Sequence, residues 1–424
     1  MLKSNMGSGI SWNLVSLIFL ALAGVVLSFV IVMYYSPEVN GIFGLSFAWY
    51  TAISQISVAG IHFSVLKYVS QYHEDKKEVD VIMGTAVLDT AVISLVVTAL
   101  SIGVVNMLHN HIGQDMFVAL MNTLPALFFF SMNKVLLNYF NGLSKMKAYA
   151  VFQSLRNLLL ALSLTLLVVL KVEGVMLTLC YLLSESILFL VMSVYILAKR
   201  MIRWRLKGSW IIEHIKFGVK IIPGNLVLAL NVRMDIFCLK LFVPFSIVGY
   251  YQLAGQIAEG FYQIIMVIRR NINPRITQHY EEKDFAKLDM LRHNVRKYPR
   301  LALPPIAMLL VGGVLAFCFI FDKTGYLNAV WPLAILTGSM CINSFWLCFG
   351  NALNQTGFPA NEAWLNVLTL IANTALNLIL IPLFGLVGGA IATATSYGVF
   401  SIILSTMLRK KTGYRLPAFA WLDK

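Results

Sequence analysis

Charged and amide side chains interrupt several long apolar stretches of this sequence. A charged side chain at the centre of a membrane-spanning helix costs roughly 2.5–3.5 kcal/mol, so it normally faces protein or water. Cations in such a setting could bind an anionic group, and carboxylates could balance those cations or carry protons. The candidates for a binding site are Arg156, Arg233, Lys134, Arg270, Gln55, His62, Gln256 and Gln263. The candidates for ion coupling are Asp235, Glu259, Glu185 and Asp89.

The spacing of these residues places many of them on one face of a helix. Gln55 and His62 are seven residues apart, and so are Gln256, Gln263 and Arg270. Steps of three, four or seven residues keep side chains on one helical face. Because such polar stripes occur in both halves of the chain, they predict a shared hydrated cleft.

Structural roles compete with functional roles at these positions. Lys134 lies within about two turns of a predicted span end, so its stem could extend to the membrane surface. Arg233 and Asp235 could form a local pair, and His62 is more often a hydrogen-bonded interior histidine than a proton carrier. Asp89 and Glu185 could each neutralise a neighbouring cation instead of coupling to an ion.

The elements that must position these residues are membrane helices. Of the 424 residues, 59% are hydrophobic and 12% are charged, against about a quarter charged in soluble domains. This composition excludes a water-soluble fold and an intrinsically disordered chain. The apolar runs are continuous, unlike the alternating strands of a membrane barrel, so they predict an all-α protein. Twelve spans are expected, at 10–34, 42–66, 81–107, 116–140, 148–170, 174–198, 217–241, 246–268, 301–321, 328–352, 363–382 and 385–408.

The distribution of basic residues predicts the orientation of these spans. If both termini are cytoplasmic, the inside segments hold 26 of the 33 Lys and Arg residues, and the outside loops hold only Lys171 and Lys323. This bias follows the positive-inside rule and explains most of the net charge of +14 without a nucleic-acid partner. The basic segments 199–216 and 269–300 are partly amphipathic, so we expect them near anionic lipid head groups.

The two halves of the chain are similar at a shift of about 208 residues. A similar pattern occurs in both halves: Pro37, Gly41 and Phe43 in the first correspond to Pro244, Gly249 and Tyr251 in the second. An even number of spans per repeat predicts two parallel six-helix lobes around a central cleft. The expected divisions are an N-terminal lobe at 1–198, a cytoplasmic interfacial linker at 199–216, a C-terminal lobe at 217–408 and a basic cytoplasmic tail at 409–424.

The sequence contains no pattern typical of catalysis or cofactor binding. It has no Walker loop, no GxSxG and no HExxH, and its five cysteines form no CxxC pair. The predicted outside loops are too short to hold a catalytic domain. We therefore expect a protein that is not an enzyme and that needs no cofactor or metal.

Three segments of the sequence are similar to segments of a known family. The first is Ser36–Gly44 with Gly60–Tyr68, and the second is Arg233–Asp235 with Val248–Tyr251. The third runs from Gly350-Asn-Ala-Leu-Asn-Gln-Thr-Gly357 through Asn377–Pro382 to Phe384–Ala390. By these segments the chain resembles bacterial polysaccharide-transporter flippases, which belong to the superfamily of multidrug, lipid-oligosaccharide and polysaccharide exporters. The resemblance extends over about residues 7–408.

This resemblance implies a function in surface glycan synthesis. The implied cargo is an oligosaccharide on undecaprenyl pyrophosphate, moved from the cytoplasmic to the outer leaflet of the inner membrane by alternating access. O-antigen or capsule would be the product, and a polysaccharide polymerase and a chain-length regulator would be partners. The family has a cationic cleft, for which the equivalents by position are Lys134, Arg156, Arg233 and Arg270.

Two other functions stay open at this point. An ion-coupled antiporter of drugs or organic cations would need a net acidic cleft, whereas intramembrane cations slightly outnumber carboxylates here. Span 10–34 also lacks the acidic residue that many multidrug members carry. A membrane-embedded glycan-assembly enzyme would need catalytic groups on external loops, which are too short.

Overall fold

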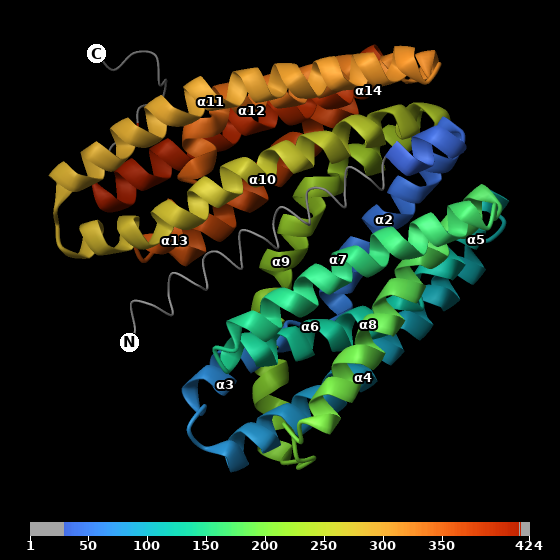
Figure 1. Cartoon of the computed structure of the whole chain (residues 1–424). Helices are drawn as coiled ribbons and strands as arrows, with labels where there is room; N and C mark the ends of the chain where they lie inside the picture. Colours follow the sequence, from blue (N-terminus) through green and yellow to red (C-terminus); the bar gives the residue numbers. More distant parts are fainter. Residues whose placement is uncertain (1–28, 415, 417–424) are drawn as a thin grey trace. The chain divides into compact units, whose positions relative to one another are not determined.

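The computed structural model describes residues 29–414 and residue 416, and within that part the chain is helical with no strand. Contacts between Cα atoms divide the chain into two compact units, which we describe separately (Figure 1). Unit 1 contains Ile42–Ala229, and unit 2 contains Ser36–Gly41 with the chain from Leu230 onward. The boundaries fall within α2 (Pro37–Ser57) and α9 (Gly208–Phe242), so these two helices contribute residues to both units.

Unit 1 is built on four long spans and a broken one. Besides α2 and the first part of α9, its elements are α3 (Ile61–Gln71), α4 (Lys76–Met107), α5 (Gln114–Thr123), α6 (Ala126–Gly142), α7 (Met146–Val169), the 3-10 helix η1 (Gly174–Thr178) and α8 (Leu179–Ala198). Its core is apolar and includes fully buried Ile61, Val65, Met83 and Phe140. The α4 surface exposes leucines such as Leu95 and Leu100, as expected for a lipid-facing helix.

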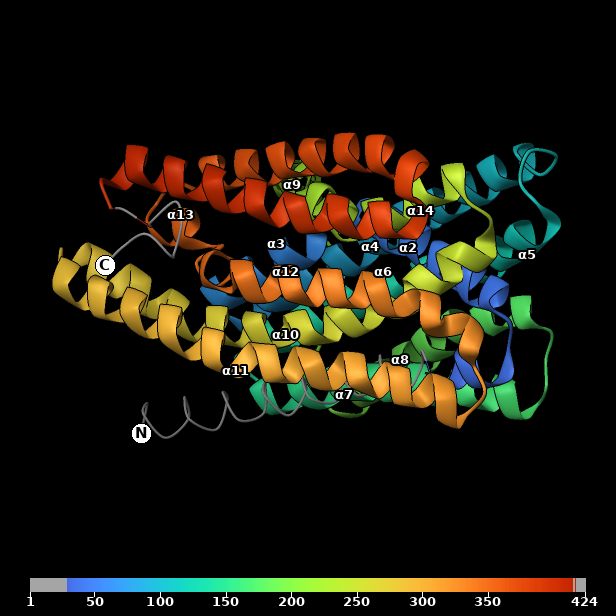
Figure 2. The same cartoon turned by 90° about the horizontal axis from the view of Figure 1, so that it is seen from above.

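Unit 2 contains the rest of α9 and a pair of long antiparallel helices that lie side by side (Figures 1 and 2). These are α10 (Phe245–Glu281) and α11 (Phe285–Ile320), followed by η2 (Thr324–Ala329), α12 (Val330–Cys348), α13 (Ala352–Gln355) and α14 (Pro359–Thr412). The 37 residues of α10 span about 55 Å, well beyond the roughly 30 Å hydrocarbon core of a bilayer. The cytoplasmic segment expected at 269–300 is therefore a helical extension of two spans.

A short turn joins these two helices. Asp284 caps α11: its Oδ1 accepts a hydrogen bond from the Lys287 backbone N–H at 3.1 Å, and its Oδ2 lies 2.9 Å from the Lys287 ammonium nitrogen. The hydrogen bond from the Lys287 side chain lowers the pKa of the Asp284 carboxyl. The carboxylate also suits the positive end of the α11 dipole.

The helices agree with the predicted spans from 42–66 onward. Among the described residues, eight helices are long and apolar enough to cross a membrane, and the pair α2–α3, bent by 49°, would make a ninth. Helix α14 covers two predicted spans, 363–382 and 385–408. Its backbone leaves helical geometry at the start of the second one, at Gly385 (φ 57°, ψ −133°). Helix α10 matches span 246–268 but is too polar to pass the same test. Most of the predicted first span, 10–34, lies outside the described residues.

The predicted internal repeat is visible in the helix packing within each unit. In unit 1, α6 packs against α3 and α4; in unit 2, α12 packs against α10 and α11 in the same way. A Cβ on Gly142, at the end of α6, would lie 3.0 Å from the Val69 side chain on α3. A Cβ on Gly350, 208 positions later and just after α12, would overlap the Arg269 side chain on α10. Both glycines thus lie close to a neighbouring helix, although Val69 and Arg269 are not equivalent positions of the repeat.

Helix α9 begins at Gly208, inside the segment 199–216 that was expected to be an interfacial linker. Trp210 and His214 are buried against unit 1: the indole Nε1 donates to Glu78 at 2.7 Å, and the His214 Nδ1 lies 2.7 Å from the Ser64 hydroxyl. Trp204, by contrast, is 61% exposed. The second part of this segment therefore packs within unit 1, and the contact boundary between the units lies later, after Ala229.

Two glycines allow α9 to approach the break between α2 and α3. Gly60 has a φ of +67°, and a Cβ on it would lie 2.9 Å from the Gly218 Cα. A Cβ on Gly218 would overlap the Ala59 carbonyl oxygen. The two backbones are thus in direct contact, and a side chain at either position would separate them.

We predict that Gly218→Ala lowers the melting temperature of the purified protein, because overpacking a tight contact costs about 1–3 kcal/mol. Gly224→Ala is the matched control, since Gly224 lies on the same helix with no heavy atom within 4 Å of its added Cβ. The control should leave the melting temperature unchanged or raise it, because alanine favours a helix by about 1 kcal/mol over glycine. Equal melting temperatures for the two variants would contradict the close contact.

Candidate functional site

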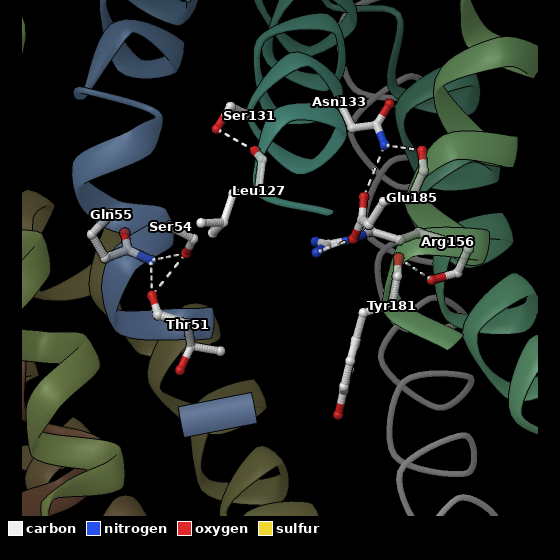
Figure 3. Close-up of polar contacts among 10 residues, drawn as sticks. Thr51, Ser54, Gln55, Leu127, Ser131, Asn133, Arg156, Tyr181 and Glu185 are labelled. Carbon is white, nitrogen blue, oxygen red and sulfur yellow. Dashed lines mark hydrogen bonds and ion pairs between the residues drawn. The ribbon is translucent and has the colours of Figure 1, made fainter. Parts of the chain in front are cut away.

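The interior of unit 1 contains an arginine whose charge is neutralised by a glutamate on the next helix (Figure 3). Glu185 Oε1, on α8, lies 2.6 Å from Arg156 Nη2 and accepts a hydrogen bond from Nε at 2.7 Å. The other carboxylate oxygen, Oε2, accepts from Asn133 Nδ2 on α6 at 2.8 Å. The exposed fractions of the two charged side chains are 21% for Arg156 and 5% for Glu185. The pair therefore ties α6, α7 and α8 together and contributes no net charge.

Lys134 lies beside this pair on α6. Its ammonium nitrogen is 5.4 Å from the centre of the Phe130 ring, and the Arg156 guanidinium carbon is 4.6 Å from the same ring. Both distances are in the range of a favourable cation–π contact. Among the described residues Lys134 has no ion pair, so this cluster of Lys134, Arg156 and Glu185 keeps one surplus positive charge.

Three other predicted residues of unit 1 are placed on separate helices. Gln55, on α2, uses its amide locally: Nε2 donates to the Thr51 carbonyl at 3.2 Å and to the Ser54 hydroxyl at 3.1 Å (Figure 3). His62, at the start of α3, is only 6% exposed, and its Nδ1 has no hydrogen-bond partner within the described chain. Asp89, on α4, is 7% exposed, and its Oδ2 likewise lacks a partner there.

Unit 2 contains a second arginine–glutamate pair, between α9 and α10. Arg233 Nη1 lies 2.6 Å from Glu259 Oε1, and Nη2 donates to Oε2 at 3.0 Å. This two-pronged geometry is the strong form of an arginine–carboxylate contact. Arg233 thus forms an ion pair with Glu259 on the neighbouring helix.

Asp235 has its own hydrogen-bond partners. The Tyr251 hydroxyl donates to Oδ2 at 2.6 Å, and the Ile236 backbone N–H donates to Oδ1 at 2.8 Å. Both donors are uncharged, so they stabilise the carboxylate without cancelling its charge. Asp235 is therefore a partly buried acid with a fixed orientation, a suitable arrangement for binding a cation or a proton.

The other predicted residues of α10 are less enclosed. Gln256 and Gln263 are partly buried, and Arg270 is exposed. The neighbouring Arg269, which the polar spacing did not indicate, is the one that packs: its Nε donates to the Leu347 carbonyl at 2.8 Å, and Nη2 makes a 3.1 Å hydrogen bond with the Tyr262 hydroxyl. Its guanidinium fills the space next to Gly350. The glycine that begins the Gly350–Gly357 segment is therefore the feature of the sequence that could have indicated this packing.

Within the described residues, no group of three or more His, Cys, Asp or Glu side chains could hold a metal ion. The five cysteines are free thiols.

We predict that Arg156→Ala destabilises the protein by about 3–5 kcal/mol, because it leaves the buried Glu185 carboxylate without its cation. Adding Glu185→Gln to this variant should recover much of the loss, since the neutral amide needs no counter-charge. Thermal unfolding of the purified single and double variants measures the coupling. Purely additive effects of the two substitutions would show that the pair does not stabilise the fold.

Comparison with known proteins places this geometry in a family. Residues 6–279 match the family described as polysaccharide biosynthesis proteins. The probable low-salt glycan biosynthesis flippase Agl15 of Haloferax volcanii is 25% identical over 171 residues, which is 40% of this chain and 36% of that protein. The probable flippase AglR of the same organism is 29% identical over 182 residues, or 42% of this chain and 38% of that protein. The chain thus spans less than two fifths of the length of either relative.

Solved structures of membrane transporters share the fold. An inward closed structure of the lipid II flippase MurJ aligns with a TM-score of 0.75 and 14% identity, over 94% of this chain and 87% of that one. An inward-facing multidrug resistance transporter of the MATE family, in the MOP superfamily, aligns with a TM-score of 0.77 and 14% identity, over 93% and 94%. These likenesses confirm the predicted all-α, two-lobed membrane fold. Since the family match covers more than half of the sequence, this chain belongs to the family of polysaccharide biosynthesis proteins.

Proposed function

We propose that this protein moves lipid-linked glycans across a membrane by alternating access. A pyrophosphate-linked sugar cannot cross hydrocarbon unaided, because removing water from its charges costs many kcal/mol. A protein that carries it must supply cations and amide groups in place of that water. The observation that carries the proposal is the surplus positive charge at Lys134, next to an arginine whose own charge is already neutralised by Glu185.

The finer features of this function are also part of the proposal. We propose undecaprenyl pyrophosphate as the carrier, an O-antigen or capsule unit as the glycan, and the inner membrane as the site, with both termini in the cytoplasm. The bias of 26 basic residues inside against two outside supports this orientation. A polysaccharide polymerase and a chain-length regulator would act on the product in the outer leaflet.

Among the four candidate coupling residues, we propose Asp235 and Asp89. Glu185 and Glu259 each bind an arginine directly, which suits a role in holding helices together. Asp235 accepts hydrogen bonds from the Tyr251 hydroxyl and the Ile236 backbone, which are uncharged donors, and Asp89 Oδ2 lacks a partner among the described residues. Both carboxylates are therefore available to exchange a cation or a proton. We propose the same binding role for the remaining candidates, which are Arg233, Arg270, Gln55, Gln256 and Gln263.

We expect the purified protein, reconstituted in liposomes, to speed the transfer of a geranylgeranyl-pyrophosphate-linked disaccharide between leaflets. A membrane-impermeant glycosidase added outside would measure the fraction of the disaccharide that has reached the outer leaflet. Protein-free liposomes and liposomes with heat-inactivated protein are the controls. Transfer at the control rate would rule out the flippase proposal, and gradient-driven export of an organic cation by the same vesicles would favour an antiporter.

Asp235→Asn should separate coupling from translocation. The amide can still accept the Tyr251 hydrogen bond but cannot carry a charge, so stimulation of transfer by a proton or sodium gradient should be lost. Transfer without a gradient should continue, because the substrate cations are unchanged. Ser344→Ala, a small change at a buried hydroxyl on α12, is a control that should keep the stimulation. Full stimulation in Asp235→Asn would assign coupling to another residue.

A further inference from the structure

Between α8 and α9 the chain crosses the surface of unit 1 as five exposed residues, 203–207, which we call the strap. The strap is neither helix nor turn. The chain is anchored on both sides of it in the apolar core of unit 1, by Ile202 before the strap and by Trp210 in the first turn of α9. Each of these two side chains is only 8% exposed. The strap is therefore held against the protein at both ends.

The backbone of the strap is fixed to the first turns of α4. The Arg203 N–H donates to the Asp80 carboxylate at 3.0 Å. At the other end of the strap, the Lys207 N–H donates to the Thr85 hydroxyl at 3.4 Å. Both acceptors are side chains of α4, so the strap follows this helix over about one and a half turns.

Every second residue of the strap contacts α4 through its backbone. The first and last residues do so through their N–H groups, and Arg205 does so through its carbonyl oxygen, which a Cβ on Gly84 would overlap. In an extended chain, successive side chains point to opposite faces. These alternating contacts therefore place the three basic side chains on one face of the strap, and Trp204 and Leu206 on the other.

The charged side chains of the strap are all basic. Arg203 and Arg205 form no ion pair within the described chain, whereas the Lys207 ammonium nitrogen lies 4.0 Å from a Glu78 oxygen. The other carboxylate beside the strap, Asp80, is only 3% exposed, and its Oδ1 accepts the hydrogen bond from the strap backbone. The two arginines are therefore available to an external anion.

The strap lies at the depth of a membrane surface. It contacts α4 at residues 80–85, where the predicted span 81–107 begins. Helix α4 has 32 residues and is about 48 Å long, so its first turns extend beyond the roughly 30 Å hydrocarbon core. Tryptophan is enriched at this level, because its ring is apolar and its N–H can still reach a polar partner. Trp204 and Leu206, which are 61% and 62% exposed, are suited to enter the lipid layer here.

We propose that the strap binds anionic phospholipids at the membrane surface. Arg203 and Arg205 contact the lipid phosphates, and Trp204 and Leu206 insert among the first acyl carbons. A basic patch alone would suit any anion, whereas its alternation with two exposed apolar side chains favours a lipid over an acidic soluble protein. In the orientation proposed above, this is the cytoplasmic leaflet. The inference concerns the surface of the protein and not its cargo, so its failure would leave the flippase proposal intact.

The test uses the full-length protein in phosphatidylcholine nanodiscs that contain increasing fractions of brominated phosphatidylglycerol, an anionic lipid that quenches tryptophan fluorescence on contact. Trp204 is one of eight tryptophans, so its share of the quenching is the difference between the protein and its Trp204→Phe variant. Brominated phosphatidylcholine, measured in the same way, gives the reference for contact without charge recognition. We expect the Trp204 share to be quenched at a lower fraction of the anionic lipid than of the neutral lipid.

Arg205→Gln should lower this preference for the anionic lipid about fivefold, the contribution of one cation near an anionic surface. Lys145→Gln is the matched control, because Lys145 is an exposed basic residue just before α7 and away from the strap. It should keep the preference. Each variant is measured against its own Trp204→Phe counterpart, and melting temperatures show whether it is folded.

Three results would overturn the proposal. No quenching of the Trp204 share by either brominated lipid would place the strap away from lipid and make an acidic soluble protein the alternative occupant. Equal quenching by the two lipids would show contact without recognition of charge. An equal loss of preference in Lys145→Gln and Arg205→Gln would assign the preference to the basic surface as a whole and not to the strap.

Discussion

A charged group inside a bilayer must exchange its water for protein partners, and this constraint shapes both units. Each meets it with an arginine–glutamate pair that joins neighbouring helices: Arg156 with Glu185, and Arg233 with Glu259. The arginines lie on helices that are not equivalent in the internal repeat. The two ion pairs are therefore not copies of one another under the repeat.

The charges left over after this pairing differ between the units. In unit 1 the described cluster keeps a cation, Lys134, beside the neutral pair of Arg156 and Glu185. In unit 2 it keeps a carboxylate, Asp235, held by a phenol and a backbone N–H. A surplus cation suits an anionic cargo, and a surplus carboxylate suits a coupling ion. The two proposed tasks of a flippase would thus be divided between the two halves of one chain.

The sequence was sufficient to predict the helical class, most of the spans and the repeat, because these follow from continuous apolar runs and from glycines at helix ends. It could not predict which charged residues would meet. Arg156 and Glu185 are on different helices, and their contact depends on how each helix is rotated about its axis. The spacing of polar residues also predicted a functional role for Arg270, which lies on the same helical face as Gln263. In the structure it is Arg269 that packs against α12. The rotation of α10 is set by its apolar contacts, such as Phe261 and Ile265, and these outweigh a polar stripe.

The turn at Gly385 has a mechanical consequence. Its dihedral angles are accessible essentially only to glycine, so α14 reverses direction at a single residue and not through a loop. Three residues later, a Cβ on Gly388 would overlap the Leu380 carbonyl oxygen, which shows that the two arms touch along their backbones. Arms in contact at this end cannot slide past each other there. The register between the last two predicted spans is therefore fixed at the turn.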